Sequence, residues 1–134
     1  MAYDEKTNAI NMPAAAALPQ GRFVKVATGG KVELCAAADD DPVGVSYQAA
    51  TAADENIAVV VADGAKVRVQ AGAALTPSAG VVQVTSDATG RAVAVQAGAP
   101  GAGERVYGYA LTDAGAADEF ITVLFLKAAS HRDA

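Results

Sequence analysis

Apolar and polar residues alternate with a period of two along most of this chain, and this alternation constrains its fold more than any other feature. Residues 24–26 and 32–34 read apolar-polar-apolar, and residues 66–70 alternate in the same way. Successive side chains of a strand point to opposite faces of a sheet, so the period predicts half-buried strands. No stretch has the period of a helix longer than two turns. The chain is therefore predicted to be all-β.

Turn signals separate the predicted strands. Thr28-Gly29-Gly30 predicts a hairpin connection, and Asp63-Gly64 predicts a hairpin between the strands before and after it, because Gly and Asp tolerate the positive φ of a tight turn. Short antiparallel strands at this spacing indicate a small β-barrel or a β-sandwich of the β-tulip type. Further strands are expected at residues 43–47, 57–62, 81–85, 92–96, 105–111 and 119–127.

The first twenty residues differ from the rest of the chain, since they carry prolines, asparagines and a short alanine run with no period. We predict an extended N-terminal arm over residues 1–20, a β-barrel domain over 21–127 and a polar tail over 128–134. A terminal segment of this kind either frays or becomes ordered on a neighbouring molecule. On a neighbour, the anchoring side chains of the arm would be Tyr3, Ile10, Met12 and Leu18.

Two predicted strands, residues 57–61 and 120–126, are apolar on both faces. An antiparallel strand with one face in water should not be apolar on both faces. The second face of each strand is therefore either covered within the chain or in contact with another subunit. Alanine supplies 34 of the 134 residues, which leaves little large apolar surface for a core. We therefore predict that the chain gains by oligomerisation. The predicted subunit or capsid interface on the last strand is Ile121, Val123 and Phe125.

One weak internal similarity is visible between residues 67–73 and residues 93–99. A solenoid needs at least three repeats to bury a stacked core, and only two copies occur here. We interpret the similarity as two strands that enter similar turns.

The charge pattern argues against several partners. The formal net charge is −5 and the ten basic residues are scattered, whereas a nucleic-acid-binding protein needs a basic patch. Nucleic acid and anionic membranes are therefore not expected as partners. No apolar run approaches the length that spans a bilayer. Asp4 and Glu5 stand where a secretory signal would be positively charged, so we expect a soluble protein that is not secreted.

The residues that enzymes and metal sites need are sparse. His131 is the sole histidine and lies near the end, and Cys35 is the sole cysteine, which precludes an intrachain disulfide and makes zinc binding improbable. Residues 39–41 are three aspartates without the spacing of a calcium loop. The stretch over residues 65–95 resembles a biotinyl or lipoyl carrier domain, but Ala88 stands where the modified lysine of the hairpin tip would be. We predict no enzymatic activity, no cofactor and no metal site.

Four short motifs follow one another along the chain: Pro42-Val43-Gly44-Val45, Ala71-Gly72-Ala73-Ala74, Gly108-Tyr109-Ala110-Leu111 and Val123-Leu124-Phe125-Leu126. In this order and spacing, over residues 20–127, the chain resembles the capsid-cement, or head-decoration, family of tailed bacteriophages. The family has no catalytic residues and no universal contact motif to transfer.

The resemblance implies a small β-barrel that forms homotrimers on the outer surface of an icosahedral phage capsid. Such proteins bind the major capsid protein at three-fold and quasi-three-fold positions and stabilise the contacts between capsomers. The chain would be made in the host cytoplasm and located in the virion. Its acidic balance suits the outside of a particle.

The alternative function is a ligand- or carbohydrate-binding β module, as in an adhesin. Such sites use exposed aromatic rings on which a sugar can stack. The chain has no tryptophan and four tyrosines, of which Tyr107 and Tyr109 are predicted to share a strand face. These two rings are the candidate platform of that alternative.

Overall fold

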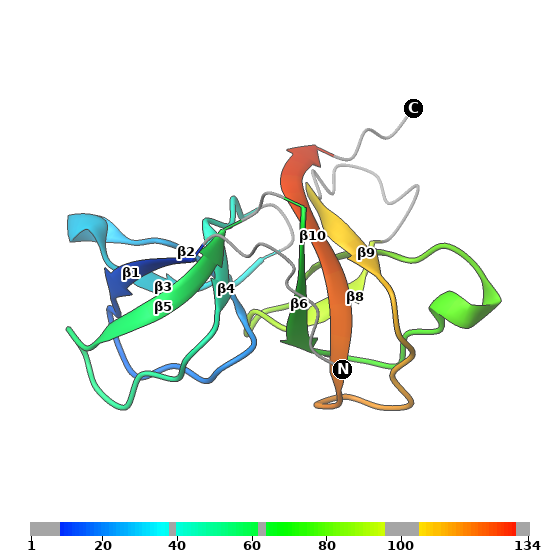
Figure 1. The fold of residues 1–134 in the computed structure, drawn as a ribbon, viewed down its shortest axis with the longest axis horizontal. Helices are drawn as coiled ribbons and strands as arrows, with labels where there is room; N and C mark the ends of the chain where they lie inside the picture. Colours follow the sequence, from blue (N-terminus) through cyan, green and yellow to red (C-terminus); the bar gives the residue numbers. More distant parts are fainter. Residues whose placement is uncertain (1–8, 38–39, 62–63, 96–104, 131–134) are drawn as a thin grey trace.

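The fold consists of two antiparallel sheets that stand next to each other (Figure 1). The computed structural model describes residues 9–37, 40–61, 64–95 and 105–130, with only the backbone at 105 and 127–130. Within these ranges no helix is long and apolar enough to cross a membrane, and the two helical segments are single 3-10 turns, Thr28–Gly30 and Pro77–Ala79. The predicted all-β class is confirmed. The sheets do not close into a barrel, so the sandwich alternative fits.

Each sheet has five strands. The first has the order β1-β5-β4-β2-β3 and is built from β1 (Ala9–Pro13), β2 (Phe23–Val26), β3 (Val32–Leu34), β4 (Gly44–Ser46) and β5 (Asn56–Val61). The second has the order β6-β10-β9-β7-β8 and is built from β6 (Ala65–Gln70), β7 (Gln83–Ser86), β8 (Ala92–Ala94), β9 (Arg105–Ala110) and β10 (Phe120–Ser130).

The two sheets are repeats of one unit, because adding five to each strand number of the first order gives the second. Their isolated bridges also correspond. Ala14 forms a parallel bridge to Val32, as Ala71 does to Ala92. The antiparallel bridge from Leu18 to Ala50 corresponds to that from Leu75 to Ala114. We refer to residues 9–61 as the first repeat and to residues 65–130 as the second.

The cores of the repeats match position by position. The strand registers and bridges superimpose seven buried residues of the first repeat on seven of the second. Ordinary apolar burial therefore stabilises each sheet from within. The first set is Ala14, Leu18, Val24, Val32, Ala50, Ile57 and Val59, and the second is Ala71, Leu75, Val84, Ala92, Ala114, Ile121 and Val123.

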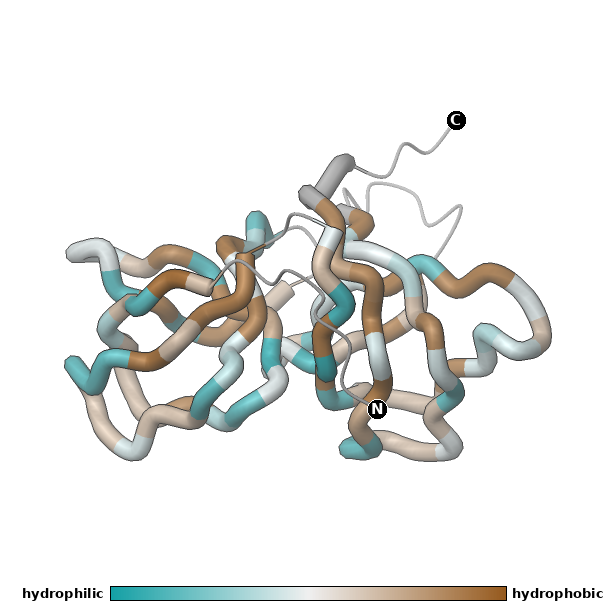
Figure 2. Tube along the Cα trace, in the orientation of Figure 1, coloured by the Kyte–Doolittle hydropathy of each residue, from teal (hydrophilic) through white to brown (hydrophobic). Residues whose placement is uncertain are grey.

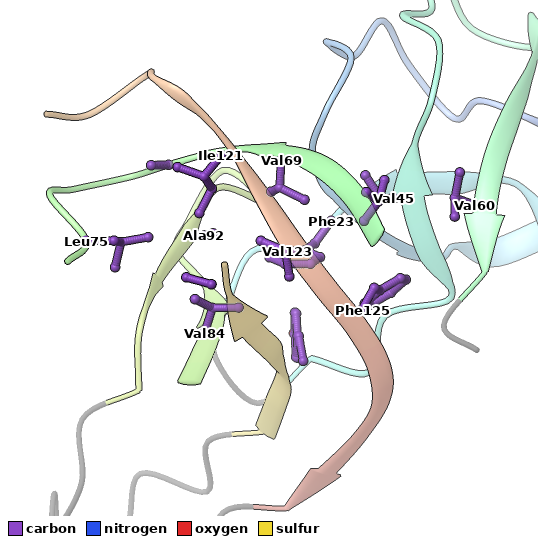
Figure 3. Packing of buried hydrophobic residues seen from close by; sticks show 14 of the residues in the cluster. Phe23, Val45, Val60, Val69, Leu75, Val84, Ala92, Ile121, Val123 and Phe125 are labelled. Atoms are coloured by element: carbon purple, nitrogen blue, oxygen red, sulfur yellow. The ribbon is translucent and has the colours of Figure 1, made fainter. Parts of the chain in front are cut away.

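The first sheet also packs its outer face against the second repeat, at a contact that we call the junction. Phe23, Val45 and Val60 lie opposite one another across β2, β4 and β5, and all three are buried in the same cluster as the core of the second repeat (Figure 3). The Phe23 ring meets the Tyr107 ring edge-on, with the centroids 4.8 Å apart, and lies 5.8 Å from the Phe125 ring. Such aromatic pairs add to the burial of apolar area. In Figure 2, apolar stretches follow the strands where the two sheets face each other.

Hydrogen bonds also connect the two repeats at the edge of the junction. The Gln70 amide donates to the Gly21 carbonyl at 2.8 Å, and the Phe23 amide donates to the Gly90 carbonyl at 2.8 Å. The Arg22 guanidinium donates to the Gln70 side chain at 2.9 Å. The junction is thus hydrogen-bonded as well as apolar, which favours one fixed arrangement of the two repeats.

The region predicted as an arm contributes to the first sheet. From residue 9 onward it forms β1, where Ile10 lies opposite Val59 and Met12 lies opposite Ile57. β1 is an edge strand, which tolerates the missing amide proton of Pro13 and needs no strict alternation. Residues 9–13 of the predicted arm therefore belong to the sheet as β1, and Ala14 and Leu18 add single bridges to Val32 and Ala50.

The predicted hairpin at Asp63-Gly64 is wrong. β5 and β6 belong to different sheets, and β6 pairs with β10 instead. Two successive strands need not pair when the connection crosses from one sheet to the other.

Candidate functional site

The predicted anchors of the arm lie in different surroundings. Tyr3 is outside the described residues. Ile10 is 43% exposed on β1, whereas Leu18 is buried and Met12 is partly buried, both in the core of the first repeat. Of the described anchors, Ile10 alone offers a large apolar surface to another molecule.

The predicted interface on the last strand is wrong. Ile121, Val123 and Phe125 are 2%, 0% and 0% exposed, and they form the core of the second repeat (Figure 3). A strand that is apolar on both faces does not reveal which face points inward, and here the prediction chose the inner one. The opposite face of β10, which includes Leu124, is partly exposed.

That opposite face is part of a row that crosses the second sheet. Leu124 lies opposite Tyr109, and Tyr109 lies opposite Gln83. All three side chains are partly exposed. In the first sheet, the same three positions are Val60, Val45 and Phe23, which the junction buries completely or almost so. The same row of three positions therefore occurs in both sheets. It is covered in the first sheet and partly exposed in the second, where we call it the open row.

The internal repeat behind the open row was not predicted, although the sequence carries its signal. Ala-Ala-Asp-Glu occurs at residues 52–55 and again at 116–119. Between residues 43–61 and 107–125, eight of nineteen positions are identical, at a constant offset (Gly44 to Gly108). The similarity that we interpreted as two similar turns was a different one, and its second copy lies partly outside the described residues.

The Ala-Ala-Asp-Glu motif performs the same structural task in both repeats. Asp54 and Asp118 have φ of 68° and 72°, and their amides donate to the Ala14 and Ala71 carbonyls, each at 2.7 Å. Aspartate tolerates this left-handed conformation better than most residues. Each carboxylate also pairs with a cation, Asp54 with Lys31 and Asp118 with Arg91.

The single cysteine, Cys35, is a buried free thiol. Burial raises the pKa of Cys35 to about 12, so its thiol is protonated at neutral pH. Its backbone amide donates to the Phe23 carbonyl at 2.9 Å at the edge of the junction. The side chain acts there as a small apolar group.

In the acidic cluster at residues 39–41, the described hydrogen bonds of Asp40 stabilise the loop in which it lies. Asp39 is outside the described residues. The Asp40 carboxylate accepts hydrogen bonds from the Ala36 and Ala37 amides and from Lys25 Nζ. Partial burial opposes ionisation, but these hydrogen bonds outweigh it and lower the pKa of Asp40. In the part of the chain that the structure describes, no group of three or more acidic, histidine or cysteine side chains could hold a metal ion.

The predicted two-tyrosine platform does not form. Tyr107 is fully buried, and its hydroxyl donates to the Asp40 carbonyl at 2.6 Å. Tyr109 is partly exposed in the open row. A sugar could not stack on Tyr107 without displacing Phe23, so this arrangement does not favour the carbohydrate-binding alternative.

The comparisons with known proteins agree with this architecture. No family model and no curated protein matches the chain. Among solved structures, the head fiber gp8.5 N base in bacteriophage phi29 is similar, with a TM-score of 0.70 and 16% sequence identity over 95% of this chain and 100% of that chain. Likeness at this identity is a likeness of fold. The chain therefore shares the fold of a phage head fiber base along almost its whole length.

Proposed function

We propose that this chain is a structural protein of a tailed-phage head. It binds the major capsid protein on the outer surface of the icosahedral shell as a homotrimer, and it stabilises the contacts between capsomers at three-fold and quasi-three-fold positions. The observation that carries the proposal is the shared fold with the phi29 head fiber base, which extends over all of that chain. The order of the four sequence motifs supports the same assignment independently of the fold.

The electrostatic character of the chain is consistent with this placement. Its net charge of −5 suits contact with a protein shell on the outside of the particle better than contact with the packaged DNA. The proposed role requires no catalytic step, no metal and no cofactor. Many weak contacts on a symmetric lattice add up to firm attachment because binding at one site raises the effective concentration at the next.

The experiment is a density-gradient purification of phage particles, followed by quantitative mass spectrometry of this chain and of the major shell protein. We expect a fixed ratio between the two chains. Mild denaturant should release this chain before the shell breaks. Absence of the chain from the particle band would overturn the proposal, and a glycan array would then test the carbohydrate-binding alternative.

A further inference from the structure

The junction joins two different surfaces. One is the row face of a repeat, which is Phe23, Val45 and Val60 in the first repeat. The other is the end face of a repeat, and in the second repeat it presents Tyr107 and Phe125 to the Phe23 ring. Because the two surfaces differ, the contact between repeats is head-to-tail rather than two-fold symmetric.

Both repeats possess both surfaces, and the junction uses only one surface of each. The row face of the second repeat remains, with Gln83, Tyr109 and Leu124 at the positions of Phe23, Val45 and Val60. The correspondence extends to the backbone at its edge. The Val95 amide donates to the Gln83 carbonyl at 2.9 Å, as the Cys35 amide does to the Phe23 carbonyl.

The end face of the first repeat also remains. There, Val43 and Val61 occupy the positions of Tyr107 and Phe125. Val43 precedes Gly44 as Tyr107 precedes Gly108, and Val61 pairs with Gly44 as Phe125 pairs with Gly108. Ile10, which is 43% exposed, occupies the position of Val67, which is 6% exposed and belongs to the same buried cluster as Phe23, Tyr107 and Phe125. Val43 and Val61 are both partly exposed. The unused end face is therefore apolar, like the one that the junction covers.

We propose that a second copy of this chain covers these surfaces, by continuing the contact that the junction already makes. The row face of the second repeat in one copy packs on the end face of the first repeat in the next copy. A head-to-tail contact closes into a ring when its rotation permits. Three copies would form a ring of six similar sheets. The inference deepens the trimer of the proposed function, but it rests on the internal repeat and needs no capsid.

The first test measures the mass of the purified chain by light scattering after size exclusion. We expect a multiple of the 13.3 kDa chain mass, three times that value for the trimer. Tyr109→Asp on the row face and Ile10→Asp on the end face should each give monomers. Val81→Asp and Val26→Asp, which change exposed valines outside both faces, are the matched controls and should keep the wild-type mass. Unchanged thermal unfolding identifies folded variants.

Mixing the two variants distinguishes the head-to-tail arrangement from any other. The Tyr109→Asp chain keeps an intact end face, and the Ile10→Asp chain keeps an intact row face. An equimolar mixture should therefore form a dimer with one copy of each, at twice the mass of one chain. A mixture that stays monomeric, a wild-type chain that is monomeric at every concentration, or variants that keep the wild-type mass would overturn the inference.

Disulfide trapping gives a measurement that does not depend on weakening the fold. Phe23 and Tyr107 touch at the junction, and their counterparts across the proposed contact are Gln83 and Val43. A Gln83→Cys, Val43→Cys double variant should form covalent multimers on oxidation, and neither single variant should. The wild-type chain is the control because Cys35 is buried and protonated. Dimers from a single variant would indicate a two-fold contact and would overturn the inference. Since no capsid is present, these results are independent of the particle-binding experiment.

Discussion

Gly44 and Gly108 occupy the same position in the two repeats, and both allow central strands to approach too closely for a side chain. A Cβ at Gly108 would lie 2.0 Å from the Leu124 carbonyl oxygen, and one at Gly44 would lie 2.3 Å from that of Val60. Gly108→Ala should therefore lower the free energy of unfolding by about 2–3 kcal/mol, as overpacking does. Urea unfolding measures the change. Gly80→Ala is the control, because its Cβ meets nothing within 4 Å, and equal stability of the two variants would contradict the close approach.

The Asp87 carboxylate predicts a pH-dependent stability. It accepts hydrogen bonds from the Thr89 and Arg91 amides and from Arg91 Nε. Partial burial opposes ionisation, but these bonds outweigh it and lower the pKa of Asp87. A carboxyl whose pKa is lower in the folded state stabilises the fold above its unfolded pKa, about 3.9, and this contribution is lost as pH falls through the folded pKa.

Asp87→Asn should therefore destabilise the fold at neutral pH by about 2 kcal/mol, and by progressively less as the solution is acidified. Urea unfolding over a pH series measures the difference between variant and wild type. Asp41→Asn, which changes an exposed carboxylate, is the control and should change stability by less than about 0.5 kcal/mol. A difference for Asp87→Asn that is constant with pH would rule out this role of the carboxylate.

At the scale of strands, alternation predicted the elements better than their partners. It located β2, β3 and β6 closely, and it located β4, β5 and β7 to β10 within a few residues. The run at residues 57–61 is apolar on both faces because Val59 enters the core of its own repeat while Val60 enters the junction. Pairing between distant strands leaves no such local trace, so neither the crossing from β5 to β6 nor the edge strand β1 could be predicted from the period.

The pairing of β1 predicts what a truncated chain will do. Deletion of residues 1–18 removes β1 together with Ala14 and Leu18, which are 0% and 5% exposed in the core of the first repeat. Loss of a buried leucine alone costs about 2–5 kcal/mol, so the first sheet should unfold. Thermal unfolding and hydrogen exchange of β5 amides measure this. A chain that lacks only residues 1–8 keeps all of β1 and is the control; equal protection of β5 in the two truncated chains would show that β1 is dispensable.

At the scale of the molecule, the architecture consists of two copies of one unit. The sequences of the two copies are identical only at positions where the same structural constraint acts in both. Gly44 and Gly108, or Asp54 and Asp118, are identical because each meets the same backbone constraint in its repeat. Phe23 and Gln83 differ because one is covered by the other repeat and one is not. The candidate site could not be read from local pattern for this reason, since exposure depends on what packs against a strand.

We predict that the junction makes the two repeats unfold together, and Phe23 is the residue that tests this. Its ring is fully buried between the sheets, against Tyr107 and Phe125, so Phe23→Ala should cost about 3–5 kcal/mol. This loss weakens the contact between two sheets that each retain a core, so the unfolding transition should split into two. The β5 amides and the β10 amides should then lose protection from hydrogen exchange at different denaturant concentrations. Ile57→Ala removes a comparable side chain from the first core and leaves the junction intact. It should lower stability while the amides of both sheets still exchange together, and a Phe23→Ala chain that behaves in the same way would show that the repeats are coupled by something other than the junction.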